Sequence, residues 1–216
     1  IIRGLKNRKN WDKAWFAYVN SPQLRFEPKT SRPQVHWENN FCPSEELVQQ
    51  LTAYPAHFQK AGPVYAARYL HDFLSQRVVL YQKGISKPAM SRKSCSRLSP
   101  FLAWGNLSIR QVVRASSGYM KNKAGKHNYD AFLTRLHWHC HFIQKFETDC
   151  TYATACINKA YEGLSYPTNE AFLEAWKTGQ TGFPLVDANM RCLHATGWIN
   201  FRMRALLVSF LCHNLV

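Results

Sequence analysis

The hydrophobic residues of this 216-residue chain recur mainly at three- and four-residue steps, the spacing of one face of an α-helix. After Gly62 the clearest run has apolar or aromatic residues at positions 66, 69, 70, 73 and 74, and Gly84 is typical of the end of such a helix. No stretch alternates between apolar and polar residues as a half-buried strand does. The pattern therefore predicts an all-α chain.

Capping residues and glycines place the other helices. Ser44, followed by Glu45 and Glu46, is typical of a helix start, whereas residues 85–95 are rich in Ser, Lys and Pro and are predicted to form a loop. Ser108 and Thr168 are candidate N-caps. Further helices are expected over residues 108–116, 130–150, 168–179, 184–195 and 200–214, with a turn-rich stretch at 117–128. The helix over 130–150 has an apolar side formed by residues 133, 136, 140, 143 and 146.

The first 60 residues are more polar and contain prolines at positions 22, 28, 33, 43 and 55. We predict that residues 1–60 form an irregular basic linker, in which Trp11, Trp15 and Trp37 serve as aromatic anchors. Residues 61–216 are then the helical domain.

The charge and the cysteine content narrow the classes of partner and the cellular compartment to consider. Lys and Arg total 28 against 13 acids, a net charge of +15. Such an excess attracts polyanions, so nucleic acid is the first partner class to consider, with acidic protein and anionic lipid as alternatives. The sequence contains no run of about 18 apolar residues, so no membrane span is expected. Seven cysteines without a CxxC pair favour reduced thiols in a cytoplasmic protein.

The first candidate site is the segment from Lys93 to Ser108, in which hydroxyl groups and basic residues precede a predicted helix. Unpaired backbone N–H groups at a helix start favour a bound phosphate. Ordinary capping by Ser96 or Ser99 is the alternative interpretation.

Residues 95–110 read CSRLSPFLAWGNLSIR. This segment resembles the photolyase and cryptochrome pattern TSRLSPYLxxGxLSxR, which wraps the FAD pyrophosphate in that family. The resemblance implies that Ser96, Arg97, Leu98 and Ser99 line the phosphates, with Cys95 in place of the usual threonine. Tyr81 matches an upstream tyrosine of the same site. The expected fold is the helical FAD-binding domain of this family.

The second candidate site, residues 133–142, contains His137, His139, His141 and Cys140. His137 and His141 share a helical face, but no second set of metal ligands follows, so no metal site is expected. The segment resembles the family motif ELxWREF, whose helix lies between the flavin and the DNA. Trp138 then occupies the position that packs against a flipped lesion, with burial in the core as the alternative. Four positions depart from the motif: Arg135 replaces its first glutamate, His139 its arginine and Cys140 its second glutamate, and Phe142 is offset from its phenylalanine.

The third segment, residues 179–204, resembles GxTGYPxVDAxMRxLxxTGWMHNRxRM. The resemblance places Arg204 beside the flavin, as the partner of an aspartate further along the family's chain, and makes Asn200 a substrate contact shifted by one position. Because that aspartate and the α/β antenna domain of the family are not in this sequence, we expect a C-terminally incomplete domain in which Arg204 is an unpaired and buried cation. For Asp187 and Arg191 the spacing favours an i, i+4 ion pair.

The resemblance implies an FAD-dependent photolyase that repairs pyrimidine photoproducts flipped out of damaged duplex DNA. A cryptochrome-type blue-light module that binds a signalling protein partner, without repair activity, is the alternative. A basic helical nucleic-acid binder without a cofactor and a metal enzyme using His137 and His141 complete the hypotheses.

Overall fold

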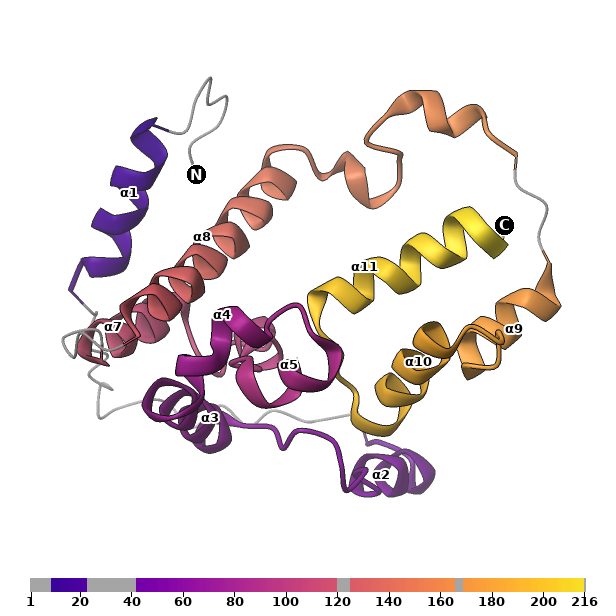
Figure 1. Ribbon diagram of the computed structural model, residues 1–216, viewed down its shortest axis with the longest axis horizontal. Coiled ribbons are helices and arrows are strands. Elements are labelled where there is room, and N and C mark those ends of the chain that lie inside the picture. The colour runs from indigo at the N-terminus through magenta and orange to yellow at the C-terminus, as the bar shows by residue number, and fades with distance from the viewer. Residues whose placement is uncertain (1–8, 23–41, 120–124, 166–168, 216) are drawn as a thin grey trace.

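The computed structural model describes residues 9–22, 42–119, 125–165 and 169–215, and these ranges contain helices and no strand (Figure 1). The all-α prediction is confirmed. The helices are α1 (Lys9–Asn20), α2 (Glu45–Thr52), α3 (Pro63–Ser75), α4 (Tyr81–Gly84), α5 (Pro88–Ser94), α6 (Ser99–Ala103), α7 (Ile109–Tyr119), α8 (Lys126–Thr148), α9 (Glu170–Thr178), α10 (Pro184–Thr196) and α11 (Phe201–Phe210). Shorter helical turns are η1 (Arg77–Leu80), η2 (Cys150–Ala153), η3 (Lys159–Gly163) and η4 (Leu211–Leu215).

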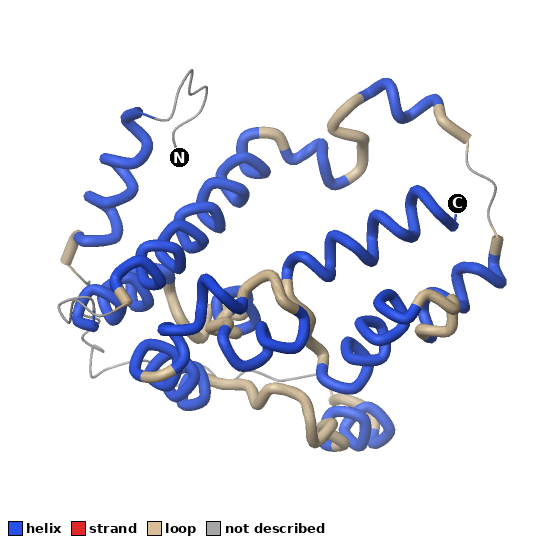
Figure 2. The backbone as a smooth tube through the Cα atoms, viewed as in Figure 1, coloured by secondary structure: helices blue, strands red, loops and turns tan. Residues whose placement is uncertain are grey.

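The larger of the two hydrophobic cores in the described residues lies among α1, α3, α7 and α8, and Figure 2 shows the helices as blue tubes. Phe73 of α3 is fully buried, and its ring centroid lies 4.7 Å from that of Phe132 on α8. Val112 of α7 is fully buried in the same core. A core of this kind stabilises through apolar area removed from water and through close packing.

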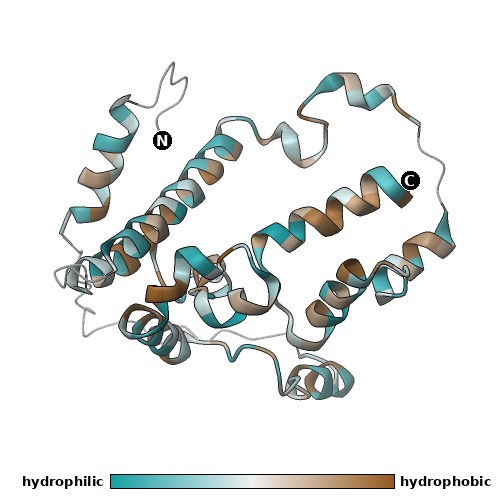
Figure 3. Cartoon of the chain, viewed as in Figure 1, coloured by the Kyte–Doolittle hydropathy of each residue, from teal (hydrophilic) through white to brown (hydrophobic). Residues whose placement is uncertain are grey.

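The second core joins α10 and α11. Met190 packs in one cluster with Met203, Leu207 and Phe210, and the indole N–H of Trp176 donates to the Leu207 carbonyl over 3.1 Å. Figure 3 shows hydrophobic residues along α8 and α11 with hydrophilic residues between them, as expected for helices that bury one side.

Polar contacts connect the two cores. The Arg92 guanidinium of α5 donates to Thr196 Oγ1 over 2.9 Å and to the Trp198 carbonyl over 3.3 Å. Trp198 itself is buried in the larger core, although it directly follows α10. Residues 91–98 therefore lie where the two halves of the described chain meet.

The N-terminal segment is more ordered than expected. Residues 9–20 form helix α1 and residues 45–52 form α2, so the prediction of an irregular segment over 1–60 is wrong at both places, while the helix start predicted at Ser44 is confirmed. Trp11 and Trp15 lie on the buried side of α1, as anchors should, while Trp37 lies outside the described residues. Trp11 and Trp15 are four residues apart and therefore share one face of the helix. Packing of this face stabilises α1 despite the polar composition of the segment.

Two boundary predictions also change. Residues 88–94, expected in a loop, form α5, which begins with proline at its first position. Helix α8 begins at Lys126 rather than at residue 130, after Gly125, whose φ of 85° is left-handed. The expected apolar side of α8 is buried only in its first half. Leu136 is buried, whereas Ile143 and Phe146 are 46% and 45% exposed. Thr168 lies outside the described residues, and Asn169 caps α9.

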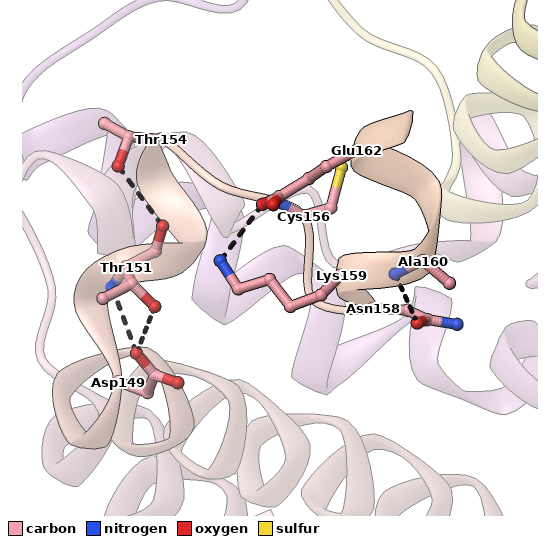
Figure 4. A network of polar contacts seen from close by, with 8 residues as sticks. All are labelled: Asp149, Thr151, Thr154, Cys156, Asn158, Lys159, Ala160 and Glu162. Atoms are coloured by element: carbon pink, nitrogen blue, oxygen red, sulfur yellow. Dashed lines mark hydrogen bonds and ion pairs between the residues drawn. The ribbon is translucent and has the colours of Figure 1, made fainter. Parts of the chain in front are cut away.

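Local polar contacts organise the connection between α8 and α9 (Figure 4). The Asp149 carboxylate accepts hydrogen bonds from the backbone N–H and the hydroxyl of Thr151, over 3.2 and 2.5 Å. The Glu162 carboxylate pairs with Lys159 over 3.1 Å. Such contacts are worth little each, but they define the two short turns η2 and η3.

No helix in the described part of the chain is long and apolar enough to cross a membrane. All seven cysteines are free.

Candidate functional site

A cavity of about 180 Å³ lies between α4 and the first half of α8. The Asn128 side chain joins its two walls through the backbone near α4. Asn128 Oδ1 accepts from the Gln82 N–H over 2.9 Å, and Asn128 Nδ2 donates to the Val79 carbonyl over 3.0 Å. The cavity is lined by Tyr81, Gln82, Ile85, Ala131, Thr134, Arg135 and Trp138. It thus brings together residues that the sequence assigned to two separate motifs.

Tyr81 forms the buried wall of this cavity. Its ring packs edge-on against Phe73 and Phe132, at centroid distances of 5.6 and 5.7 Å. Burial raises the pKa of the phenol, the Cys95 thiol raises it further, and the Arg135 charge lowers it. The hydroxyl is therefore a neutral hydrogen-bond donor at neutral pH, and it makes no hydrogen bond to another described residue.

Arg135 and Trp138 form the outer wall. The guanidinium carbon of Arg135 lies 4.5 Å from the centroid of the Trp138 ring, the geometry of a cation–π contact. Trp138 is 42% exposed, so its burial in the core, the alternative interpretation, is wrong. The cavity lining contains no carboxylate, and Arg135 forms no ion pair with a described residue. This wall accordingly offers an aromatic face and a fork of N–H donors.

The segment 95–99 lies between α5 and α6. Cys95 and Leu98 are buried, Ser96 is half-buried and Ser99 is exposed. Neither serine caps α6, which has no side-chain cap, so the capping alternative is wrong. Both hydroxyls are without a hydrogen bond to a described residue and remain available to a ligand.

Two residues far away in the sequence hold this segment. The Arg77 guanidinium donates to the Cys95 carbonyl, and Gln59 Nε2 donates to the Arg97 carbonyl over 2.8 Å. Arg97 has a φ of 57°, a left-handed conformation that costs free energy for a residue with a side chain. The sequence did not predict these roles of Arg77 and Gln59. A long-range hydrogen bond to a backbone carbonyl leaves no local sequence pattern.

The side chains of Cys95 and Arg97 are turned inward. Burial raises the pKa of the Cys95 thiol to about 11, against the opposing charge of Arg77. The Arg97 guanidinium lies near the rings of Tyr69 and Trp198, 5.7 and 5.3 Å from their centroids, and burial lowers its pKa. Arg97 therefore contributes a positive field to the segment, while its side chain packs among aromatic rings.

Asn200, expected as a substrate contact, is buried away from the cavity. Its Oδ1 accepts from the Met203 N–H over 2.8 Å and caps α11. Its Nδ2 donates to Ser91 Oγ over 3.1 Å and to the Ile85 carbonyl over 3.4 Å. The amide is fully engaged in holding α11 against α5, so the structure gives Asn200 a packing role.

Arg204, expected as a buried cation, is exposed on α11. Phe142 is 60% exposed on α8 and does not line the cavity. His139 is partly buried, and burial lowers its pKa, which favours the neutral imidazole. The neighbouring His137 packs between Trp11 and Trp15 of α1, with ring centroids 4.3 and 4.5 Å away, and its Nε2 lies 3.4 Å from Asp12.

Asp187 closes the turn before α10 rather than pairing mainly with Arg191. Its carboxylate accepts from the Thr181 N–H over 2.8 Å, from the Thr181 hydroxyl over 2.6 Å and from the Gly182 N–H over 3.0 Å. The Thr181 hydroxyl is the first cause of a lowered pKa, and Arg191 is the last. The expected ion pair does not form among the described residues, and Arg191 acts on Asp187 only through its charge.

This carboxylate predicts a pH dependence of stability. Because the folded-state pKa of Asp187 is depressed, its contribution is present above the ordinary aspartate pKa of about 3.9 and is lost as the pH falls through the folded-state value. We expect Asp187→Asn to lower the urea midpoint at pH 7, and the difference from wild type to shrink below about pH 4. Glu147→Gln, at an exposed position of α8, is the control. An equal difference at pH 3 and pH 7 would contradict the assignment.

Known proteins match this chain over much of its length. The family model described as the FAD binding domain of DNA photolyase matches residues 132–216. The deoxyribodipyrimidine photo-lyase of Alkalihalophilus pseudofirmus is 31% identical over 157 residues, which cover 72% of this chain and 31% of that protein. Cryptochrome DASH of Synechocystis sp. is 34% identical over 202 residues, covering 85% of this chain and 40% of that protein. This chain thus spans well under half of either relative.

Solved structures share the helical arrangement. The bacterial class III photolyase from Agrobacterium tumefaciens superposes with a TM-score of 0.69 at 26% identity, over 78% of this chain and 34% of that one. The cryptochrome of Synechocystis sp. PCC6803 gives a TM-score of 0.66 at 28% identity, over 74% of this chain and 34% of that one. Photolyases and cryptochromes are therefore matched about equally well.

Proposed function

Because this chain belongs to the photolyase/cryptochrome family, as part of its helical FAD-binding domain, we propose that it binds FAD and serves in the light-driven repair of pyrimidine photoproducts in DNA. The observation that carries the proposal is the shared cavity. Tyr81, from the predicted cofactor site, and Arg135 and Trp138, from the predicted DNA site, line the same space.

The cavity and the segment 95–99, which does not line it, together offer groups that fit part of an anionic dinucleotide. The Tyr81 hydroxyl lines the cavity without a protein partner, the lining has no carboxylate, and the hydroxyls of Ser96 and Ser99 are unused. The cavity of about 180 Å³ is smaller than the roughly 300–1,000 Å³ usual for drug-sized ligands, so it holds only a portion of FAD. In this proposal Tyr81 and the serines bind the phosphates, together with the positive field of Arg97.

When bound and reduced, FAD supplies the electron that splits a photoproduct under near-UV or blue light. The protein's contribution is to bind and orient. Trp138 offers a face on which a flipped base stacks, worth about 1–3 kcal/mol per base in single-strand sites. Flipping a base out of the duplex costs a few kcal/mol, and it costs least for a damaged base. Stacking on Trp138 therefore offsets this cost more completely for a lesion than for a base of intact duplex.

Arg135 makes the outer wall of this cavity a hydrogen-bond donor. A guanidinium has five N–H donors and no acceptor, so it pairs with carbonyl oxygens or phosphates and never with a base N–H. Thymine presents such a carbonyl at O4. The glutamate of the family motif would accept hydrogen bonds at this place, and Arg135 donates them. We therefore assign Arg135 to the carbonyl or phosphate groups of the lesion.

The net charge of +15 supports DNA as the partner, because Lys and Arg side chains that neutralise phosphates release condensed counterions. In this proposal, affinity for DNA falls steeply with salt while the preference for a lesion, carried by Trp138 and Arg135, falls less.

A second candidate function is a cryptochrome-type light response without repair. It is favoured by the cationic Arg135 in the cavity and by the similarity to cryptochromes, such as Cryptochrome-2 of Arabidopsis thaliana at 29% identity over 218 residues. Illumination of the FAD-loaded protein with dimer-containing DNA separates the two functions: loss of dimers supports repair, and intact dimers support signalling.

The first test is FAD binding by the chain itself. We expect saturable binding, measured by flavin fluorescence quenching during titration. Tyr81→Phe should weaken it about 10- to 150-fold, since a hydrogen bond to a charged group contributes about 1.5–3 kcal/mol. Tyr161→Phe, on the exposed turn η3, is the matched control. A folded chain that binds no FAD would overturn the proposal.

A further inference from the structure

A second cavity, of about 400 Å³, lies away from the first, between the α2–α3 connection and the end of α6. Its volume falls within the range of small-molecule pockets. Its main side chains are Tyr54, Gln59 and Lys60 on one wall and Phe101, Trp104 and Asn106 on the other.

Hydrogen bonds fix both walls in place. On the first wall, the Tyr54 hydroxyl donates to the Gln59 carbonyl, and Gln59 Nε2 donates to the Arg97 carbonyl over 2.8 Å. On the second wall, the Asn106 N–H donates to the carbonyl of Phe101 over 2.8 Å, and the Phe101 ring is buried. A cavity between such walls exists before a ligand arrives, which lowers the ordering cost of binding.

The cavity offers flat aromatic surface. Trp104 is 85% exposed and Tyr54 is 50% exposed, although both are large apolar residues that usually bury much of their area. Trp104 lies at the C-terminus of α6, and Gly105, with a φ of 69°, turns the chain directly after it. An indole in this position is suited to stacking on a planar ring.

Its polar groups are an unpaired acceptor, a free amide and a cation. Gln59 Oε1 is buried without a hydrogen-bond partner, and such an acceptor costs about 1–3 kcal/mol in general. The amide of Asn106 makes no side-chain hydrogen bond to a described residue. Lys60 lies on the rim, with its Nζ 5.5 Å from the Tyr65 ring centroid, and no carboxylate lines the cavity.

We propose that this cavity binds an adenine nucleotide. Adenine presents an N6 amino donor beside the N7 acceptor, the edge that Asn and Gln side chains pair with, whereas guanine and cytosine edges suit Arg and carboxylates. Trp104 stacks on the base, the Asn106 amide takes its polar edge, and Lys60 binds the phosphate as a point charge, while Gln59 holds the wall through its bond to the Arg97 carbonyl. None of these residues lines the first cavity, so the proposal does not depend on FAD binding.

Isothermal titration of the chain with AMP, adenosine and TMP tests this assignment. We expect saturable AMP binding, weaker binding of TMP, and a loss of about 5- to 150-fold in Trp104→Ala, since each stacked base contributes that much. Lys60→Gln should weaken binding of AMP and leave adenosine unchanged. Because Trp104 is exposed, its removal should not affect folding, and circular dichroism checks this.

Oligo(dA) and oligo(dT) hexamers identify the source of the nucleotide. Tighter binding of oligo(dA) than of AMP shows that the cavity takes a nucleotide of a single strand, and equal binding shows that it takes the free nucleotide; both outcomes support the site. Trp138→Ala is the control at the first cavity and should leave AMP binding unchanged. The proposal is overturned if AMP and TMP bind equally, if no saturable binding occurs, or if Tyr81→Phe abolishes AMP binding while Trp104→Ala does not.

Discussion

Replacing Trp138 by alanine is expected to weaken binding of a single-stranded oligonucleotide that carries a cyclobutane thymine dimer by about 5- to 150-fold. The loss follows from one stacking face, worth about 1–3 kcal/mol, at about 1.4 kcal/mol for each tenfold change in affinity. The Arg135 guanidinium, 4.5 Å from the ring centroid, loses its cation–π partner in the same variant and becomes less ordered. Fluorescence anisotropy at fixed salt measures the effect.

Phe172→Ala provides the matched control, because Phe172 is a half-exposed aromatic residue on α9, outside both cavities. It should change the affinity by less than about twofold. The same titration with an undamaged oligonucleotide separates lesion recognition from contacts to the phosphate backbone. If Trp138→Ala binds damaged and undamaged strands with unchanged affinity, the lesion pocket is not at this cavity.

Replacing Asn200 by alanine is expected to lower the free energy of unfolding by about 1–3.5 kcal/mol. The variant loses the N-cap of α11, worth about 0.5–2 kcal/mol, and the buried hydrogen bond to Ser91, worth about 0.5–1.5 kcal/mol. Urea unfolding followed by circular dichroism measures the difference. This loss is expected without FAD or DNA, which distinguishes a packing role for Asn200 from a substrate contact.

A second asparagine cap gives the comparison. Asn169 caps α9 through the Phe172 N–H over 3.1 Å, but it is exposed and its side chain makes no further hydrogen bond to a described residue. Asn169→Ala should therefore cost only the cap, about 1 kcal/mol. Equal losses in the two variants would show that the bond from Asn200 to Ser91 contributes nothing to stability.

Much of the helical frame was predictable from the sequence. Gly179 and Gly197 end α9 and α10 in left-handed conformations, as expected of glycines after apolar runs. Helices α1 and α5 were missed, because their local composition is polar and rich in lysine or proline. What makes them helical is packing: Trp11 and Trp15 bury against α8, and Gly84 lies so close to Ser94 that a Cβ there would meet its Oγ at 2.2 Å.

The candidate site was predictable in its members and less so in its arrangement. Tyr81 and Trp138 are 57 positions apart by residue number, and only the contact between α4 and α8 places them around one cavity. Asn200 follows the family pattern one position out of register, and in this chain that position is the N-cap of α11, where the amide is buried. The supporting contacts from Gln59 and Arg77 had no local pattern to find.

The two hydrophobic cores meet through Trp198 and a small number of polar contacts, chiefly those of Arg92 and Asn200. Apolar area gives a folded unit most of its cooperativity, and little of it is shared here. We therefore expect the part of the chain around α10 and α11 to open separately from the larger core. In hydrogen exchange, the amides of α10 and α11 become labelled together through a sub-global opening, while the central turns of α3, α7 and α8 stay protected until the whole protein unfolds.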